Sequence, residues 1–361
     1  MAKRKVRADG RYESTFSING KKKHFYGSTL KEARRKRDDY IALMDRCPLA
    51  NQRVGLGEWV SAWLETIKSD IAPTTLSSYT GLLGKHIIRS QIGSIALQDL
   101  TPSVFRSQWQ RMIDEGMSPR TVAYVHTITS ASLKQAAMDG LIPMDPLLYV
   151  RRPRQIRKEA KALTEMQIRE LQQSIQDPLF LRIVNFALST GMRRGEILGL
   201  HWEDVNFEKG QVSINQSVIR KDGKETISTS LKTASSRRTI SIDSKTIDLL
   251  HIQKAYDMRM KLKSQNFSNL DLVFCREDGS PLRQNSVTLK MSRIFKSLGW
   301  EGFSFHSLRH THATLLLKNG VHFKIVQYRL GHSTFQQTMD TYSHVTPEME
   351  SNVTSVTEKI L

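Results

Sequence analysis

The sequence predicts a multidomain α+β protein with three parts: a small β-sheet plus one helix at the N-terminus, a helical bundle, and a mostly helical domain with a small antiparallel sheet. A length of 361 residues exceeds what one hydrophobic core usually fills. An alternating pattern surrounds a turn at Asn19-Gly20, whereas apolar residues recur at helical spacing from residue 55. Segments rich in Val, Ile and Thr return after residue 210, between helical segments.

The domain boundaries are expected where this periodicity or the charge changes. They give an N-terminal domain over 1–54, a helical domain over 55–150, a basic linker over 151–163, a third domain over 164–346 and a C-terminal helix over 347–361. No internal repeat and no low-complexity segment interrupts this division.

The chain is strongly basic, with 54 Lys and Arg against 35 Asp and Glu and a formal net charge of +19. This excess predicts a polyanionic partner, because basic side chains that neutralise phosphates release condensed counterions. Nucleic acid is favoured over a membrane surface, since no apolar stretch approaches the roughly 18 residues that span a bilayer. Cys47 and Cys275 are too few for a disulfide framework or a Cys-rich zinc site, which favours the reducing cytoplasm.

Residues 1–37 are the most basic part of the chain, with thirteen Lys and Arg against three Asp and Glu. Strand-like segments on both sides of the Asn19-Gly20 turn predict a β-hairpin, and Ser28 is expected to cap a helix from Thr29 to Asp45. A basic hairpin fits a DNA major groove, although a charged face in solvent is the simpler alternative. The residues expected to contact DNA here are Lys3, Arg4, Lys5, Arg7, Arg11, Lys21, Lys22 and Lys23.

Residues 55–150 are expected to form four helices in a compact bundle. Apolar side chains recur at helical spacing from Leu56 to Lys68. Three further helices are expected to start at the prolines in positions 73, 102 and 119, because proline is tolerated in the first helical turn. The linker that follows has no apolar period, and three of its arginines are expected to lie along a phosphate backbone: Arg151, Arg152 and Arg154.

The third domain is expected to begin with a helix whose capping box is formed by Thr164 and Gln167. A second helix is expected from Pro178 to Thr190, ending at Gly191. Segments 211–219, 226–231 and 238–242 are expected to form one three-stranded antiparallel sheet. Helices are expected again over 246–263 and from residue 306 onward.

Polar residues that a core would not need occur in four separated stretches of this third domain. Arg193 follows a helix stop and precedes Glu196 by three residues, so the carboxylate can orient the guanidinium. Lys232 is expected in a turn between two strands, where a flexible amine can reach a groove. His306 and Arg309 share one face of a helix. The last stretch supplies two more polar residues, His332 and Tyr342.

The motifs Thr-Gly-x-Arg-x-x-Glu, Lys-Thr, His-x-Leu-Arg-His and Leu-Gly-His, with a tyrosine ten residues after the last histidine, resemble those of the tyrosine recombinases. This is the integrase family of phages and conjugative elements. The resemblance implies that Arg193 and Arg309 grip the scissile phosphate and that Tyr342 is the nucleophile. It implies further roles for the general acid Lys232, the phosphate-pocket residues His306 and His332, and the supporting carboxylate Glu196. The alternatives to Lys232 as the general acid are Lys221, Lys224 and Arg237.

The chemistry implied is phosphoryl transfer without a cofactor. Two guanidiniums can hold the nonbridging oxygens bidentately, and a phenol with a pKa of about 10 needs help to lose its proton. The 3′-phosphotyrosyl link conserves the bond energy, which removes the need for ATP. No metal is expected, because a carboxylate cluster for two-metal chemistry is not evident and the His306–His310 pair lacks the Glu of a zinc-binding His-Glu-x-x-His. Structural roles are expected for His310, His312 and His344.

The implied function is site-specific DNA recombination, in which two duplexes are cut and rejoined through 3′-phosphotyrosyl and Holliday-junction intermediates to integrate and excise a mobile element. The family implies a homo-tetramer on paired core sites and an N-terminal domain on arm sites. An excisionase and a host DNA-bending protein are further partners, and the expected location is the cytoplasm, at the nucleoid. The alternatives are a non-catalytic DNA-binding regulator and a type IB topoisomerase; the separate basic N-terminal module argues against the latter.

The C-terminal segment is expected to form a short amphipathic helix over 347–360. A proline follows Thr346, and apolar residues recur at positions 349, 353, 356 and 360. This stripe needs a groove on its own catalytic domain or on a neighbouring protomer. The family's exchange of C-terminal segments favours the neighbour.

Overall fold

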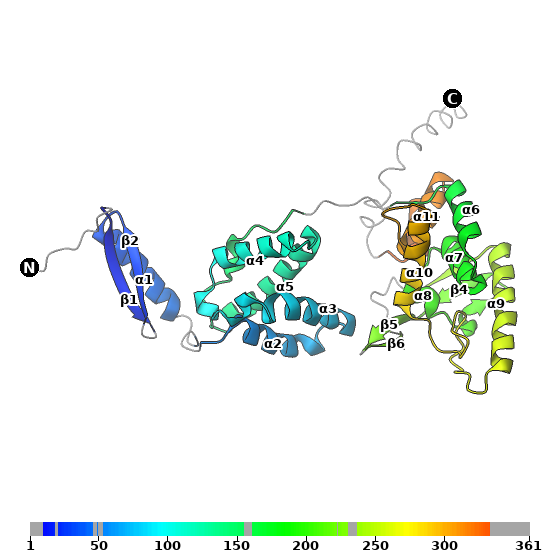
Figure 1. Cartoon of the computed structure of the whole chain (residues 1–361), viewed down its shortest axis with the longest axis horizontal. Helices are drawn as coiled ribbons and strands as arrows, with labels where there is room; N and C mark the ends of the chain where they lie inside the picture. The colour runs from blue at the N-terminus through cyan, green and yellow to red at the C-terminus, as the bar shows by residue number, and fades with distance from the viewer. Residues whose placement is uncertain are drawn as a thin grey trace, which may run out of the picture. The chain divides into compact units, whose positions relative to one another are not determined.

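The computed structural model describes residues 10–18, 21–45, 49, 53–154, 161–221, 223–229 and 237–332 (Figure 1). The chain divides into two compact units, Met1–Arg157 and Lys158–Leu361. Several sequence predictions lie outside the described residues: the helix over 347–360, the residues Lys3, Arg4, Lys5, Arg7, Cys47, Lys232, Tyr342 and His344, and the side chain of Lys21.

The first unit begins with the predicted hairpin, formed by β1 (Tyr12–Ile18) and β2 (Lys21–Gly27), and α1 (Leu30–Asp45). The strands pair antiparallel with Tyr12 opposite Gly27. The prediction that Ser28 caps a helix from Thr29 is wrong by one residue. The amide of Glu32 donates to Thr29 Oγ1 at 3.1 Å, so Thr29 is the cap. Ser28 instead donates its amide and hydroxyl to the Glu32 carboxylate.

The two faces of this hairpin have different surroundings. Phe25 packs on Tyr40 of α1, with ring centroids 5.3 Å apart, and the Lys23 ammonium lies 4.1 Å from the centroid of the same Tyr40 ring. Arg11 lies over the ring of Tyr26. Tyr26 directly follows Phe25 in β2, so it lies on the opposite face of the hairpin. Lys22 shares this second face by the alternation of the strand. The helix therefore covers the face of Lys23 and leaves that of Arg11 and Lys22 open.

The four helices predicted within 55–150 are present. They are α2 (Leu56–Thr66), α3 (Pro73–Leu83), α4 (Pro102–Asp114) and α5 (Pro119–Met138). The last three begin at the predicted prolines, and a 3₁₀ turn takes the first helix on to Ser69. Their buried side chains form one core that includes Leu56, Val60, Leu83, Phe105, Met112 and Leu133. Beyond it, the predicted linker residues Arg151, Arg152 and Arg154 are exposed and belong to no helix or strand.

The second unit is mostly helical, as predicted. Its helices are α6 (Glu165–Ser174), α7 (Pro178–Thr190), α8 (Arg194–Leu198), α9 (Ser244–Lys263), α10 (Gln284–Ser297), α11 (Phe305–Lys318) and α12 (Phe323–Leu330). The predicted capping box is present, since Thr164 and Gln167 exchange hydrogen bonds between side chain and backbone. α7 ends at Gly191 in a left-handed conformation, also as predicted.

The prediction of one three-stranded sheet over 211–219, 226–231 and 238–242 is wrong. The three-stranded sheet consists of β3 (Val205–Asn206), β4 (Gln211–Ile214) and β7 (Arg238–Ser241), while β5 (Ser217–Lys221) and β6 (Lys224–Ser228) form a separate hairpin. The cause lies in two polar side chains between β4 and β5. Asn215 donates to Asp204 at 2.7 Å and Gln216 contacts His201, so the chain leaves the ladder there.

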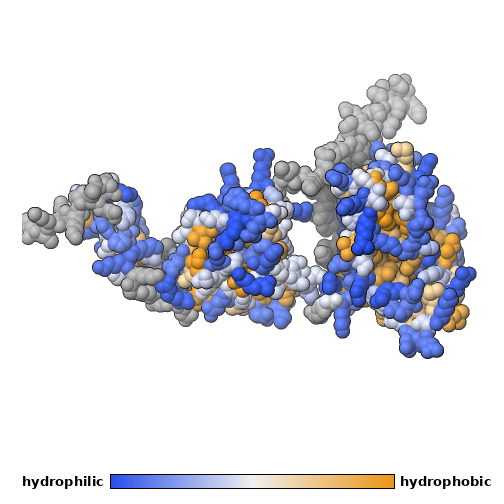
Figure 2. Space-filling model, in the orientation of Figure 1, coloured by the Kyte–Doolittle hydropathy of each residue, from blue (hydrophilic) through white to orange (hydrophobic). Residues whose placement is uncertain are grey.

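The described surface is largely hydrophilic in the view of Figure 2, with smaller apolar areas on both units. Among the described residues, no helix combines the length and the apolar character that a membrane span requires.

Candidate active site

The second unit brings together the five predicted catalytic residues that lie in the described part of the chain. Arg193 and Glu196 lie at the start of α8, His306 and Arg309 lie on α11, and His332 follows the end of α12. Lys232 and Tyr342 lie outside the described residues. The two lysines considered as alternatives to Lys232 occupy the turn end of the β5–β6 hairpin, and the third alternative, Arg237, is exposed just before β7.

Arg193 is held by both its main chain and its side chain. Its amide donates to Glu196 Oε2 at 2.9 Å, and its Nη1 donates to Glu196 Oε1 at 2.8 Å. Its Nη2 donates to the carbonyl oxygen of Gly331 at 2.7 Å. The side chain keeps 37% of its surface exposed, against 4% for Glu196. A fixed but accessible guanidinium suits the binding of an external anion.

Arg309 connects the ends of two helices. Its Nη1 donates to the Gly191 carbonyl oxygen at 2.9 Å, and its Nη2 donates to the Leu330 carbonyl oxygen at 2.6 Å. α7 and α12 each end at a glycine with φ of 64°, Gly191 and Gly331. The last carbonyls of a helix have no partner within it and carry partial negative charge, so a cation is favourable at both ends.

Three arginines donate to three successive carbonyls at the end of α12. Arg238 binds the carbonyl of Arg329 at 2.7 Å, next to the bonds that Arg309 and Arg193 make to the carbonyls of residues 330 and 331. The helix itself packs on α11 through Val326 and Leu330. His332 is the next residue along the chain, and its own amide donates to the carbonyl of Gln327 at 3.2 Å, so its backbone is attached to the helix end that the three guanidiniums bind.

Glu196 lies between two of these arginines. The carboxylate accepts from Arg238 at 2.8 Å and 3.2 Å in addition to its bonds from Arg193. Burial disfavours its charge, but the hydrogen bond and charge of Arg238 and the charge of Arg193 outweigh this and lower the pKa of Glu196. The charge order is therefore cation, anion, cation across the site.

Arg238 was missed by the sequence analysis, which considered only its neighbour Arg237. A signal was present in the alternation of the strand. Arg238 and Ile240 are both buried, whereas Thr239 and Ser241 are exposed. An arginine on the buried face of a strand needs a buried partner.

The histidines of the site are neutral near pH 7. Partial burial, the neighbouring His310 and the charge of Arg309 lower the pKa of His306 to about 4, while the residue as a whole stays exposed. Burial and the charges of Arg309 and Arg193 lower the pKa of His332 to about 3. Neutral imidazoles can exchange hydrogen bonds and protons with a phosphate ester without adding charge to the site.

Two further histidines on α11 support this arrangement. The rings of His306 and His310 meet edge to face with centroids 4.6 Å apart. His312 bonds Leu188 O through Nδ1 at 2.7 Å and accepts from Arg329 through Nε2 at 3.0 Å, in line with the structural role expected for it. Within the described part of the chain, no group of three or more His, Cys, Asp or Glu side chains could hold a metal ion.

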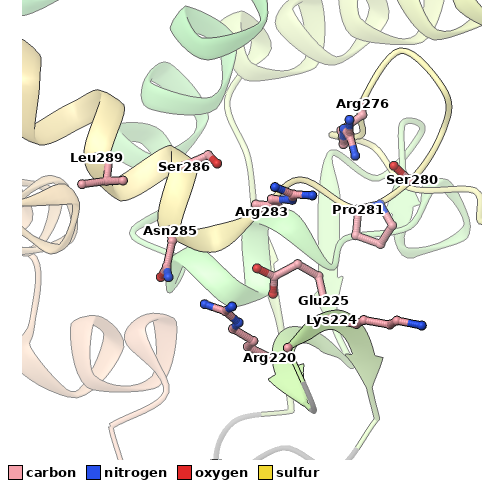
Figure 3. A pocket seen from close by; sticks show the side chains of 11 residues that line it. Arg220, Lys224, Glu225, Arg276, Ser280, Pro281, Arg283, Asn285, Ser286 and Leu289 are labelled. Carbon is pink, nitrogen blue, oxygen red and sulfur yellow. The ribbon is translucent and has the colours of Figure 1, made fainter.

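A basic pocket of about 570 Å³ lies between the β5–β6 hairpin and the start of α10 (Figure 3). Its charged lining residues are Arg220, Lys224, Glu225, Arg276 and Arg283. In Figure 3 the side chains of Arg220, Glu225 and Arg283 are turned into this space. Four cations against one carboxylate make the pocket attractive to an anion, and the sequence analysis did not single out Arg276 or Arg283.

Gln284 connects this pocket to the arginine site. Its side-chain amide donates to the carbonyl of Val218 in β5 at 2.6 Å, and its amide oxygen accepts from Arg194 Nη2 at 2.9 Å. Its backbone amide donates to Glu225 in β6 at 3.2 Å. Arg194 directly follows Arg193, so Gln284 links the hairpin to the start of α8, where the arginine site begins.

Residues 158–349 match the phage integrase family, and residues 56–112 match the SAM-like N-terminal domain of phage integrases. The chain belongs to the phage integrase family. A related protein of Caldanaerobacter subterraneus subsp. tengcongensis, a XerC-like tyrosine recombinase, is 27% identical over an alignment covering 92% of this chain and 91% of the relative. Membership of the phage integrase family makes the protein a tyrosine recombinase, an enzyme of DNA breakage and rejoining.

Solved structures of integrases share the fold. The Tn1549 transposon integrase in complex with a circular intermediate DNA matches with a TM-score of 0.68 and 19% identity, covering 82% of this chain and 99% of that chain. The lambda integrase tetramer bound to a Holliday junction matches with a TM-score of 0.61 and 20% identity, covering 92% of this chain and 96% of that chain. The predicted fold class is therefore confirmed.

Proposed function

We propose that the protein integrates and excises a mobile element by cutting DNA at a core site through attack of Tyr342 on the scissile phosphate. The observation that carries this proposal is the pairing of Arg193 and Arg309 around one structural element, the end of α12. Two forked guanidiniums fixed in this way can hold the two nonbridging oxygens of a phosphodiester and stabilise the charge that develops in the transition state.

In the proposed step, the phenolic oxygen of Tyr342 forms a bond to phosphorus as the bond to the 5′ oxygen breaks. The phenolic proton passes to a neutral imidazole, for which His306 and His332 are the candidates, and Lys232 gives a proton to the leaving 5′ oxygen. The product is a 3′-phosphotyrosyl link. Attack by the 5′ hydroxyl of the other duplex reverses the step and forms the Holliday junction without an energy source.

The basic pocket beside the hairpin is proposed to hold backbone phosphates of the same duplex. Its side chains offer fixed positive charge next to the arginine site, and Gln284 couples the two. Phosphate contacts of this kind set the register of a protein on DNA without reading its sequence. The hairpin would then sense bound DNA directly.

The remaining parts are proposed to extend this DNA contact. Residues 1–54 would bind arm sites, residues 55–150 and the catalytic domain at 164–346 would both bind the core site, and the linker arginines would follow the DNA backbone. We propose a tetramer on two core sites, by analogy with the lambda integrase tetramer, with the helix over 347–361 docked on a neighbour. An excisionase, a host DNA-bending protein and a cytoplasmic location at the nucleoid complete the proposal.

A nicked core-site duplex tests the proposal, because the strand beyond the cleavage point dissociates and traps the covalent intermediate. The wild-type protein should form an adduct that survives denaturation, and Tyr342→Phe should bind the duplex without forming it. Absence of any adduct from the wild-type protein would favour a non-catalytic DNA-binding regulator. Relaxation of supercoiled DNA without a core site would favour the topoisomerase. An adduct formed by Tyr342→Phe would show that another tyrosine is the nucleophile.

A further inference from the structure

Arg238 and Glu196 form an ion pair inside the second unit. The exposed fraction is 0% for the Arg238 side chain and 4% for that of Glu196, and the closest N–O distance is 2.8 Å. Arg238 reaches the site from β7, whereas Glu196 stands in α8, 42 residues earlier in the chain. Moving two charges out of water is costly, and removing one partner of such a pair leaves the other uncompensated.

The pair also determines how Glu196 acts on Arg193. Glu196 binds Arg193 through its amide and its Nη1, so it fixes the direction of that guanidinium. A carboxylate facing Arg193 alone would cancel the positive charge that the phosphate needs. With Arg238 on its other side, Glu196 is shared between two cations, and the three groups together keep one net positive charge.

Arg238 has a second contact that bears on the site. Its Nε donates to the carbonyl of Arg329. The next two carbonyls, of Leu330 and Gly331, accept hydrogen bonds from Arg309 and Arg193. One guanidinium therefore touches both the carboxylate that orients Arg193 and the helix end that precedes His332.

The geometry points to Arg238 as a positioning residue for strand cleavage, acting through Glu196 on Arg193 and through the end of α12 on His332. This inference rests on the proposed function, because it assumes that Arg193 binds the scissile phosphate. Arg238 itself does not contact DNA, since its side chain is wholly buried. Its loss should therefore slow the chemical step and leave the affinity for core-site DNA nearly unchanged.

The test compares Arg238→Gln and Arg238→Lys with Arg182→Gln in the full-length protein. Arg182 is a matched control, because it is a partly buried arginine of α7 that bonds Gln253 at 2.6 Å, away from the arginine site. Two quantities are measured for each variant: the single-turnover rate of adduct formation on the nicked duplex and the dissociation constant for an intact core-site duplex.

Arg238→Gln should lower the single-turnover rate ~100-fold, the loss typical of a reacting group displaced by about 1 Å, with little change in the dissociation constant. Arg238→Lys keeps the charge but not the forked guanidinium, so its cleavage rate should lie between those of the wild type and Arg238→Gln. Arg182→Gln should cleave at the wild-type rate. The inference is overturned if both Arg238 variants cleave at the rate of Arg182→Gln, or if rate and affinity fall in parallel.

A double-mutant cycle with Glu196→Gln identifies the route of action. If Arg238 acts mainly through Glu196, Glu196→Gln combined with Arg238→Gln should cleave no more slowly than the worse single variant. Multiplying losses would contradict this route. The double variant also removes both buried charges, so together with Arg238→Lys it provides the test should Arg238→Gln not fold. A wild-type protein that forms no adduct would overturn the proposed function instead.

Discussion

Arg309 and Gly191 are joined by a hydrogen bond of 2.9 Å between Nη1 of the arginine and the carbonyl oxygen of the glycine. Gly191 ends α7 and lies two residues before Arg193, so this bond ties the helix that carries Arg309 to the loop that carries Arg193, the two arginines proposed to bind the scissile phosphate. Both arginines also donate to the end of α12. Backbone carbonyls thus hold both guanidiniums in place, as the proposed binding of a phosphate by a preorganised site requires.

Replacing either arginine by lysine should separate catalysis from stability. Arg193→Lys and Arg309→Lys should each lower the single-turnover cleavage rate ~100-fold or more, because an ammonium cannot reproduce the bidentate fork. Arg309→Lys should also lower the free energy of unfolding, by about 1–3 kcal/mol and by more than Arg193→Lys, since Arg309 is 3% exposed whereas 37% of the Arg193 side chain is exposed. Urea unfolding measures this difference. Near-normal cleavage by either variant would contradict its role at the phosphate.

Glu196→Gln should destabilise the protein by about 3 kcal/mol, because Arg238 is left without its counter-charge in the interior. The pKa of Glu196 is lowered in the folded state, so its ionised form stabilises the protein above the ordinary value of 4.5, and this stabilisation is lost as the pH falls below it. Urea unfolding at pH 3.5 and pH 7 should therefore show a smaller difference between variant and wild type at the lower pH. An equal difference at both pH values would be inconsistent with an ionised, paired Glu196.

Gly191→Ala should disturb the site from the backbone. The residue has φ of 64°, and a Cβ there would lie 2.5 Å from Cδ2 of His312. Gly320→Ala is the matched control, because Gly320 also has a positive φ, of 76°, with no atom within 4 Å of its Cβ position. The control should cost about 1–2 kcal/mol of unfolding free energy from strain alone, and Gly191→Ala should cost more and slow cleavage. Equal losses of stability with normal cleavage would show that His312 moves aside freely.

The local signals of the sequence predicted most helix starts correctly. Ser118 accepts the Thr121 amide at 3.1 Å and Thr164 accepts the Gln167 amide at 3.2 Å, and both partners lie within one turn of the cap. The strands were harder, because pairing depends on residues distant in sequence. The ladder breaks at Asn215, whose partner Asp204 lies eleven residues earlier in a 3₁₀ turn that the pattern of Val, Ile and Thr does not reveal.

The site was predicted only as far as its motifs extend. Spacing along α11 and after α7 indicated Arg193, Glu196, His306 and Arg309, and the structure places them together. The spacing of the motifs could not reveal that Arg238 bonds Glu196 from β7. It also could not reveal that the carbonyls at the end of α12 accept hydrogen bonds from three arginines, since a carbonyl has no sequence signature. These contacts depend on how the helices pack rather than on any motif.

Acid should destabilise the protein through its buried histidines. Burial and the charge of Arg329 lower the pKa of His312 to about 4 from 6.5, and His312 is 7% exposed. Below pH 6.5 the unfolded chain takes up a proton that the folded protein does not, so stability falls as the pH drops toward 4. The slope of unfolding free energy against pH reports the number of protons taken up on unfolding. In His312→Gln this number should be smaller by up to about one proton. An unchanged slope would show that His312 titrates normally in the folded protein.

The two faces of the N-terminal hairpin should contribute unequally to DNA binding. Lys22 lies on the face that α1 leaves open, whereas the Lys23 ammonium lies 4.1 Å from the Tyr40 ring centroid on the covered face. If the open face enters a DNA groove, Lys22→Ala should weaken binding to an arm-site duplex and reduce the slope of log affinity against log salt by about 0.9, the value for one lost phosphate contact. Lys23→Ala removes the same charge and should change this slope much less. Equal effects of the two variants would mean that only the total charge of the hairpin matters, and a larger effect of Lys23→Ala would place the DNA on the helix side.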